Sequence, residues 1–356
     1  MPLVDLLAED LRCLERMEMS LHPGLNVISG PNGAGKTSIL EAAFLLGRGR
    51  SFRTRSSERL IRLGAPRAIA FGRTSTHSVG VEVQRGSGQA SATTRAKVNG
   101  AFVSSLAELT QAFPVQVIDP EVLDLVNGGA TGRRRWLDWS VFHVEPGFGE
   151  HWARYARALK QRNAAVRAGA GPDALVVWDR ELAASGEPMA RARARHFLEL
   201  EPALGAAQDS LLGFRVALSW SSGWDRERSL AEALQGAQTH DVSRGTTSVG
   251  PHRADLRLRV GHRAAGEVLS RGQQKLLALA LVLAQLELMQ STHQIRPTVL
   301  IDDPAAELDN FRLASVIQRV RALETQLVVT TLSPESSLFG APDRVFQVGQ
   351  GRVQTL

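Results

Sequence analysis

Glycines, one lysine and one threonine form a short segment whose spacing suits phosphate binding. The segment contains Gly30, Pro31, Asn32, Gly33, Ala34, Gly35, Lys36 and Thr37. Glycines let the backbone wrap closely around an anion, and the free amides at a helix start point toward it. We expect Lys36 to reach the β and γ phosphates of a nucleotide and Thr37 to bind Mg²⁺. We therefore interpret residues 30–37 as a phosphate-binding loop and not as an accidental turn.

Two adjacent aspartates follow three apolar residues late in the chain. The apolar residues predict a buried strand, and α/β sheets bind ligands at the carboxyl ends of their strands. We expect Asp302 to hold Mg²⁺ and Asp303 to orient the water that attacks the γ-phosphate. Lys36 and Asp303 are thus the predicted catalytic residues. The alternative, a helix cap, is disfavoured by the apolar residues and by the phosphate loop.

A third segment, formed by Ser270, Arg271, Gly272 and Gln273, precedes a long apolar stretch. Ser270 is well suited to cap a helix there, and the free amides of that helix start make a second anion-binding site. One helix start already serves the phosphates through Lys36. A second one is useful if it binds the ATP of a partner subunit, although the segment alone reads equally well as an ordinary capped helix.

The elements around these segments predict an α/β fold. An apolar run between two glycines predicts a strand over 25–29, and apolar residues at helical spacing predict a helix over 37–46. Short stretches of alternating apolar and polar residues, separated by glycines, predict an antiparallel meander over 66–103. Two short apolar runs later in the chain, 299–301 and 327–329, are each typical of a fully buried strand.

Between these elements the composition changes to alanine, arginine, leucine and glutamate at helical spacing, with expected breaks at 128–129, 146–147, 169–172 and 186–188. We predict a helical insertion lobe over 119–249. It would interrupt an α/β domain whose halves, 1–118 and 250–356, fold together.

The composition favours a cytoplasmic protein. Of 356 residues 43% are apolar, and a single cysteine cannot form an internal disulfide. The strongest apolar run, 276–284, is far shorter than the roughly 20 residues of a membrane span. We expect no membrane partner.

Arginines are concentrated in two regions of this chain of net charge +6. Residues 48–73 hold eight arginines and one acid, and residues 133–167 hold eight bases and three acids. Any one of these arginines reads most simply as a solvated side chain, but the guanidinium fork suits phosphate oxygens. The candidates for DNA contacts are Arg48, Arg50, Arg53, Arg55, Arg133 and Arg134.

In this order the motifs resemble those of ABC-type ATPases, and within them the RecF family of recombination mediator proteins. Further matching blocks span most of the chain. They include residues 35–42, 49–53, 155–163, 250–253 and 270–275, Arg133-Arg134 with Leu137-Asp138, Trp178-Asp179 with Glu181-Leu182, and Asp302-Asp303 with Glu307-Leu308-Asp309.

The resemblance implies an ABC-type ATPase head, with a mixed sheet and an antiparallel β lobe, that carries the helical insertion lobe. It implies a weak DNA-stimulated ATPase of DNA repair and replication that uses ATP and Mg²⁺ and forms an ATP-dependent homodimer. That dimer would bind single- and double-stranded DNA and help RecO and RecR to load RecA at gaps.

The resemblance also implies roles for further residues. Glu307 and Asp309 would belong to a dimer-interface loop, and Thr331 would sense the γ-phosphate. Gln116 is the candidate for a lobe-coupling glutamine near Mg²⁺, although a plain surface glutamine is an equal alternative.

Three residues depart from the family pattern: Ala306 replaces a serine, Ala254 replaces an aspartate, and Pro304 follows the aspartates directly. None of these changes removes a predicted phosphate, metal or water ligand.

One histidine and two tryptophans could each have a structural or a functional role. His252 is interpreted as structural and not as catalytic. Trp136 and Trp139 are interpreted as core and not as base-stacking residues.

Two other functions share features of this sequence. An ATPase subunit of a transporter would share the three motifs, but the 234 residues between Lys36 and Ser270 exceed what a compact subunit needs. A non-catalytic scaffold is disfavoured by the intact Asp302 and Asp303.

Overall fold

The computed structural model describes residues 2–86, 91–103, 105–304, 310–333 and 340–356. The chain forms two compact units. The first comprises Met1–Val122 and Met289–Leu356, and the second comprises Leu123–Leu288. Residues 250–288, which the sequence analysis assigned to the second half of the α/β domain, therefore lie in the second unit.

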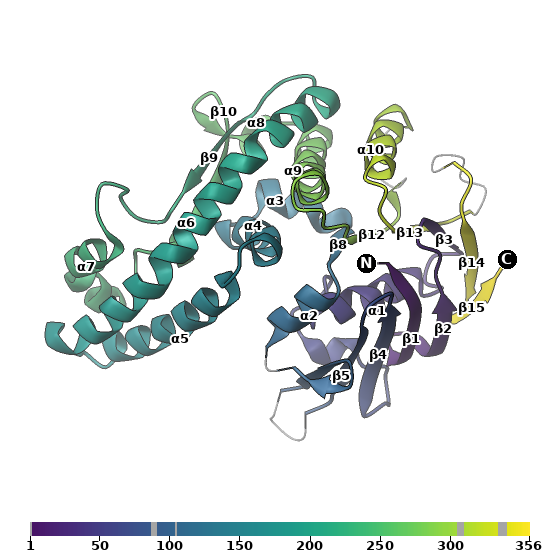
Figure 1. The fold of residues 1–356 in the computed structure, drawn as a ribbon, viewed down its shortest axis with the longest axis horizontal. Coiled ribbons are helices and arrows are strands. Elements are labelled where there is room, and N and C mark those ends of the chain that lie inside the picture. Colours follow the sequence, from purple (N-terminus) through teal and green to yellow (C-terminus); the bar gives the residue numbers. More distant parts are fainter. Residues whose placement is uncertain (1, 87–90, 104, 305–309, 334–339) are drawn as a thin grey trace. The chain divides into compact units, whose positions relative to one another are not determined.

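The first unit contains an antiparallel sheet whose strand order is β2-β1-β4-β5-β6-β7 (Figure 1). Its strands are β1 (Leu3–Leu11), β2 (Leu14–Ser20), β4 (Arg67–Thr74), β5 (Ser78–Gln84), β6 (Thr93–Val98) and β7 (Ala101–Phe102). Burial alternates along β4 and β5 because one face of the sheet packs on the core. The predicted meander over 66–103 is confirmed.

The second sheet of this unit has the order β15-β14-β3-β13-β12-β8. Its strands are β3 (Leu25–Ser29), β8 (Val115–Ile118), β12 (Thr298–Ile301), β13 (Leu327–Thr331), β14 (Arg344–Gly349) and β15 (Arg352–Thr355). All neighbours from β14 to β8 pair in parallel, and only β15 is antiparallel to its neighbour. The predicted strands 25–29, 299–301 and 327–329 are confirmed, and their carboxyl ends share one edge.

Helix α1 (Lys36–Arg48) contacts strands of both sheets, so it is buried on nearly all sides. This explains why its sequence lacks a polar stripe. Gly49 ends the helix with φ 62° and donates its amide to the Leu45 carbonyl. The described part of the unit also contains the α-helices α2 (Leu106–Ala112) and α10 (Asn310–Ala322).

The second unit is mainly helical. Its helices are α3 (Asp124–Asn127), α4 (Ala130–Val144), α5 (Phe148–Arg167), α6 (Pro172–Leu211), α7 (Leu230–Arg244), α8 (Ala265–Val268) and α9 (Arg271–Ser291), the last of which ends in the first unit.

The predicted break at 186–188 is wrong, because α6 continues through it. A Cβ at Gly186 would lie 2.7 Å from Leu230 and 2.9 Å from Tyr155, so neighbouring helices pack closely on this point. That packing holds the helix across Pro188, which lacks an amide hydrogen.

A three-stranded sheet of order β11-β10-β9 also lies in the second unit. Strand β9 (Ala217–Ser221) comes from the predicted helical insertion and pairs antiparallel with β10 (Asp255–Val260), which continues into β11 (Arg263–Ala264). Because β10 depends on β9 for its ladder, the residues after 250 belong with this unit.

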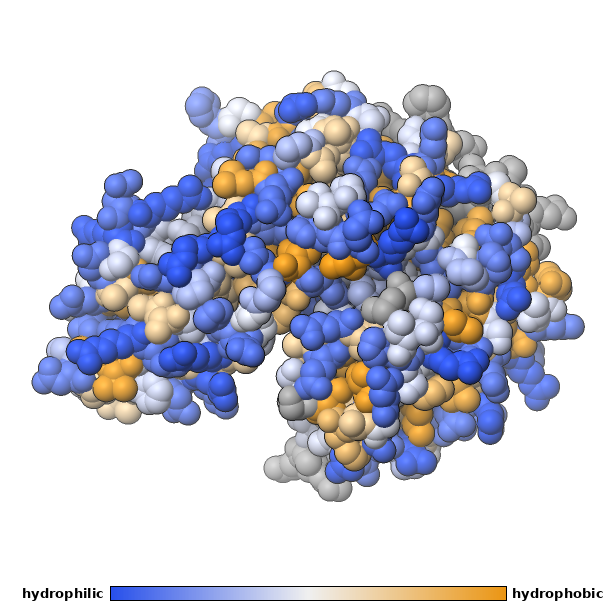
Figure 2. All heavy atoms as spheres, in the orientation of Figure 1, coloured by the Kyte–Doolittle hydropathy of each residue, from blue (hydrophilic) through white to orange (hydrophobic). Residues whose placement is uncertain are grey.

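The surface over α5 and α6 is mainly hydrophilic, with scattered hydrophobic side chains (Figure 2). The apolar run 276–284 is buried inside α9. Within the residues that the structure describes, no helix is long and apolar enough to cross a membrane.

Candidate functional site

Four parallel strands of the first unit bring the predicted motifs to one edge. The strands lie side by side in the order β3-β13-β12-β8. Strand β3 leads into the loop 30–35, β13 ends at Thr331, β12 leads to Asp302, and β8 leads to Asp119. Segments far apart in the sequence therefore meet at the carboxyl ends of the strands, where ligands bind in such sheets.

The loop requires its glycines. Gly30 has φ 154°, and a Cβ there would lie 2.3 Å from the carbonyl oxygen of Val348. Gly35 has φ 112°, in the left-handed region, and a Cβ there would lie 3.1 Å from the Cys13 Sγ. This backbone ends at Lys36, where α1 begins without a side-chain cap, so its first-turn amides are available to an anion.

Lys36 is buried above the loop. Its Nζ donates to the carbonyl oxygens of Gly30 at 2.6 Å and of Pro31 at 3.0 Å. Among the residues in the described ranges, no carboxylate forms an ion pair with it. A buried ammonium that has only carbonyl partners keeps an uncompensated charge, so this corner fits an anionic phosphate.

Thr37, Asp302 and Thr330 form a cluster of oxygen ligands. The Thr37 hydroxyl lies 3.1 Å from both Asp302 carboxylate oxygens, and Thr330 Oγ1 donates to Asp302 Oδ1 at 2.8 Å. Hydroxyl and carboxylate oxygens are the ligands that Mg²⁺ prefers, so the cluster fits that ion. Thr330 was not among the predicted site residues, although its place at the end of a predicted buried strand was a usable signal.

Asp303 is held by the same threonine. Its backbone amide donates to Thr330 Oγ1 at 2.9 Å, and its φ of 41° lies in the left-handed region, which aspartate tolerates better than most residues. Thr330 thus fixes both the carboxylate of Asp302 and the backbone of Asp303.

Asp119 is a further acid that the sequence analysis did not single out. Burial, followed by repulsion from Glu121 and from Asp302, raises its pKa to about 7. Repulsion between Asp119 and Asp302 shows that negative charge accumulates at this corner. A cation at Asp302 would relieve that repulsion, which is a second reason why Mg²⁺ fits.

Two other predicted residues lie elsewhere on these strands. Gln116 is in register with Val299, inside β8, and its Oε1 accepts a hydrogen bond from Arg48 at 3.0 Å. It is not brought to Asp302. Thr331 ends β13, where its hydroxyl donates to the Ser333 carbonyl at 3.2 Å.

Glu307 and Asp309, like Ala306, lie outside the described residues. Their predicted place in a dimer interface stays a prediction.

Ser270 directly precedes helix α9 in the second unit, and its role as a cap is confirmed. The Gln273 amide donates to Ser270 Oγ at 3.4 Å, and the Ser270 amide donates to Gln273 Oε1 at 2.9 Å, which together form a capping box. Arg271 and Gly272 are exposed. The described contacts show how this helix start is held, and its action on a second copy stays a prediction.

Several arginines that were candidates for DNA contacts have internal partners. Arg48 donates to the Val115 carbonyl, and burial, with repulsion from Arg50, holds its pKa below the ordinary value. Arg53 lies 3.9 Å from the buried Glu41. Arg50 and Arg55 are exposed.

The two remaining candidates for DNA contacts, Arg133 and Arg134, also have internal partners. Arg133 donates to both carboxylate oxygens of Asp255, and Arg134 donates to the carbonyl of Ala254 at 2.7 Å. Ala254 itself is buried. Arg133 and Arg134 thus anchor helix α4 to strand β10.

His252 is structural, as its hydrogen bonds show. Its Nε2 donates to the Thr247 carbonyl at 3.0 Å, so its Nδ1 accepts from the Tyr155 hydroxyl at 2.7 Å. Burial lowers the pKa of His252 to about 4. Trp136 and Trp139 are buried, so their assignment to the core is confirmed.

Comparisons with known proteins agree over the whole chain. Residues 2–354 match the family model described as RecF/RecN/SMC N terminal domain. The DNA replication and repair protein RecF of Pectobacterium atrosepticum is 38% identical over 359 residues, which cover 99% of this chain and 98% of the relative. The protein of the same name from Yersinia pseudotuberculosis is 36% identical over 361 residues, 99% of each chain.

Two solved structures share the fold. One is the recombination mediator protein RecF-ATPrS in the RecFOR pathway, with TM-score 0.85, 24% identity and coverage of 100% of this chain and 98% of that one. The other is an SmcHead bound to the C-winged helix domain of ScpA, with TM-score 0.61, 15% identity and coverage of 100% and 97%.

Proposed function

The chain belongs to the RecF family of DNA replication and repair proteins, and on that premise we propose that it is an ATP-operated DNA-binding switch of recombinational repair. The observation that carries the proposal is the meeting of Lys36, Thr37 and Asp302 at one sheet edge. Family membership over residues 2–354 argues against a transporter subunit.

At this site Lys36 would exchange its carbonyl partners for the β and γ phosphates of ATP. Thr37 and Asp302 would hold Mg²⁺, which when bound neutralises charge on the phosphate oxygens. Asp303 would orient the attacking water and accept its proton late in the reaction. Because aspartate is one methylene shorter than glutamate, we expect slow hydrolysis.

One chain supplies half of a complete site in this proposal. Ser270 to Gln273 of a second copy would bind the γ-phosphate through the free amides of α9. ATP would thereby close a head-to-tail homodimer, and the closed dimer would bind single- and double-stranded DNA at gaps until hydrolysis releases it.

Family membership supports the cellular part of the proposal. The chain would act in the cytoplasm with RecR and RecO, and through them would help to load RecA on gapped DNA. DNA would stimulate its weak ATPase activity.

Sedimentation velocity with ATP and Mg²⁺, with and without a gapped duplex, tests this function. We expect a dimer with ATP and a larger complex when DNA is added. Lys36→Ala should remain a monomer under all conditions, whereas Lys97→Ala, which removes the same charge from an exposed position on β6, should behave as the unmodified protein does. Equal sedimentation with and without ATP would refute the switch.

A further inference from the structure

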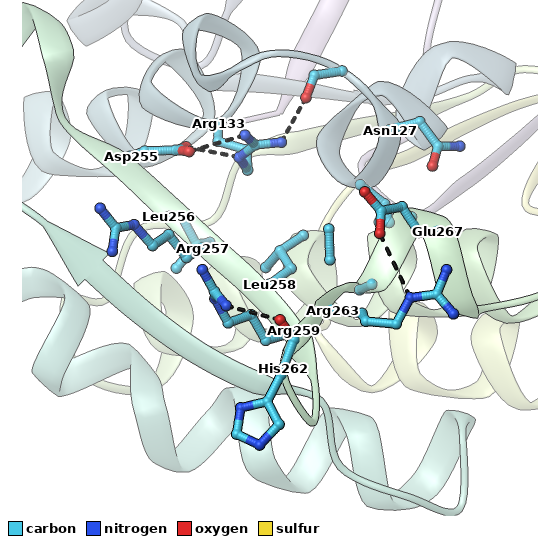
Figure 3. Close-up of a pocket in the computed structure, with 15 residues that line it drawn as sticks. Asn127, Arg133, Asp255, Leu256, Arg257, Leu258, Arg259, His262, Arg263 and Glu267 are labelled. Atoms are coloured by element: carbon cyan, nitrogen blue, oxygen red, sulfur yellow. Dashed lines mark hydrogen bonds and ion pairs between the residues drawn. The ribbon is translucent and has the colours of Figure 1, made fainter.

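A basic pocket lies in the second unit among α3, α4, α8, β10 and β11 (Figure 3). Its volume is about 710 Å³. The charged side chains that line it are Arg133, Arg257, Arg259, Arg263, Asp255 and Glu267. Neither the phosphate loop nor the α9 helix start contributes to it.

Two ion pairs cancel part of the charge in this pocket. Arg133 donates from Nε and Nη2 to the two carboxylate oxygens of Asp255, at 2.8 Å and 3.1 Å. Arg263 Nε lies 3.8 Å from a carboxylate oxygen of Glu267. The surplus positive charge is therefore carried by the remaining two arginines.

Arg257 and Arg259 carry that surplus, and both are exposed on β10. Arg259 uses Nη1 for one hydrogen bond, to the His262 carbonyl at 3.0 Å, and keeps its other donors. Arg257 has no hydrogen bond or ion pair within the described part of the chain. Their cross-strand neighbours are small, with Ser219 opposite Arg257 and Ala217 opposite Arg259, so neither guanidinium is covered.

The arrangement of these groups favours an extended ligand. Residues two apart on a strand share a face and lie about 7 Å apart. In Figure 3 the guanidinium groups of Arg133, Arg257, Arg259 and Arg263 are spread along the pocket and do not converge on one point. A single small anion would require convergent donors, whereas a chain of regularly spaced phosphates matches cations spread along a surface.

We propose that this pocket binds the phosphate backbone of DNA, with Arg257 and Arg259 as contacts to neighbouring phosphates. The proposal rests on the DNA-binding function proposed above and assigns it a surface. It also separates roles within the second unit: Arg133 and Arg134 hold β10 in place, and β10 presents the two arginines that contact DNA.

The test measures binding of a fluorescein-labelled gapped duplex by anisotropy, with ATP and Mg²⁺, over a series of NaCl concentrations. The double variant Arg257→Ala/Arg259→Ala should bind at least roughly tenfold more weakly. The slope of log affinity against log salt should become shallower by about 2, since each lost phosphate contact removes close to one unit. Arg257→Lys/Arg259→Lys keeps the charge and should retain a slope near that of the unmodified protein.

The matched control is Arg180→Ala/Arg191→Ala, which removes equal charge from exposed positions of α6. It should leave affinity and slope unchanged. ATP-dependent sedimentation should be the same for all four proteins, because no residue of the nucleotide site lines the pocket. A loss of dimerisation in the alanine double variant, or equal losses of affinity in the control, would overturn the assignment.

Failure of this inference is distinguishable from failure of the proposed function. If the unmodified protein binds DNA and the Arg257→Ala/Arg259→Ala variant matches its affinity and slope, the DNA-binding function stands and the pocket assignment falls. The pocket would then suit an acidic protein segment. If the unmodified protein binds no DNA, both proposals fall.

Discussion

Thr330 donates a hydrogen bond of 2.8 Å to the carboxylate of Asp302 and accepts one of 2.9 Å from the backbone amide of Asp303. One buried hydroxyl thus positions both acidic residues that are proposed to act on ATP. Thr330 belongs to β13, whereas the two aspartates directly follow β12, so the arrangement exists only when β12 and β13 pair.

Thr330→Val keeps the shape of the side chain and removes the hydroxyl. A hydrogen bond to a charged group contributes about 1.5–3 kcal/mol, so we expect the ATPase kcat to fall by roughly tenfold or more. The Mg²⁺ concentration needed for half-maximal activity should rise, because Asp302 loses its orientation. Thr330→Ser restores the hydroxyl and should recover most of both values. Equal activity of the valine and serine variants would count against this role.

Asp303→Asn should trap the ATP-bound dimer on DNA. An amide cannot accept the proton of the attacking water, and loss of a general base lowers rates by about 10²–10⁴-fold. Single-turnover hydrolysis and the dissociation of labelled gapped DNA are the measurements. Asp303→Glu is the matched variant, which keeps the base and should hydrolyse ATP. Normal release of DNA by Asp303→Asn would contradict the assignment.

Asp119 makes stability depend on pH in the nucleotide-free and Mg²⁺-free protein. Its pKa is about 7 in the folded chain, far above the usual value of 3.8, so the folded state binds more protons between these pH values. Its contribution to stability is therefore greatest at low pH and is lost as pH rises through 7. Asp119→Asn needs no proton and should raise the free energy of unfolding at pH 8 by up to about 4 kcal/mol.

Urea unfolding at pH 5 and pH 8 measures this effect. The gain from Asp119→Asn should be much smaller at pH 5, where Asp119 is protonated. A gain of the same size at both pH values would mean that ionisation of Asp119 is not its cause.

His252 produces the opposite dependence in the second unit. Burial lowers its pKa to about 4, so below the ordinary value of 6.5 the unfolded chain binds the additional proton. The free energy of unfolding should therefore fall as pH falls from 6.5 toward 4, by up to about 3 kcal/mol. A proton on Nδ1 would also end the hydrogen bond that Tyr155 donates.

Thermal unfolding of the unmodified protein and of His252→Gln between pH 4 and 7 tests this expectation. The variant should be less stable than the unmodified protein at pH 7, and its melting temperature should fall less as the pH is lowered. Parallel losses in the two proteins would assign the acid sensitivity to other groups.

The sequence by itself determined the local parts of this protein. The loop 30–37 with its flanking strand and helix, the cap at Ser270 and the aspartates after β12 depend on neighbours within a few residues. Glycine conformation, capping and apolar runs act over that range, so these elements were predictable, as was the burial of Trp136.

Only the tertiary structure decided which of the many arginines are paired inside the protein and which are available to a ligand. Arginine density drew attention to Arg133, yet Asp255 neutralises it while Arg257 on the same strand as Asp255 has no partner within the described chain. Strand pairing likewise brought Thr330 to Asp302 and β9 to β10. These relationships join residues far apart in sequence, and their strength depends on burial and distance, which composition and spacing do not contain.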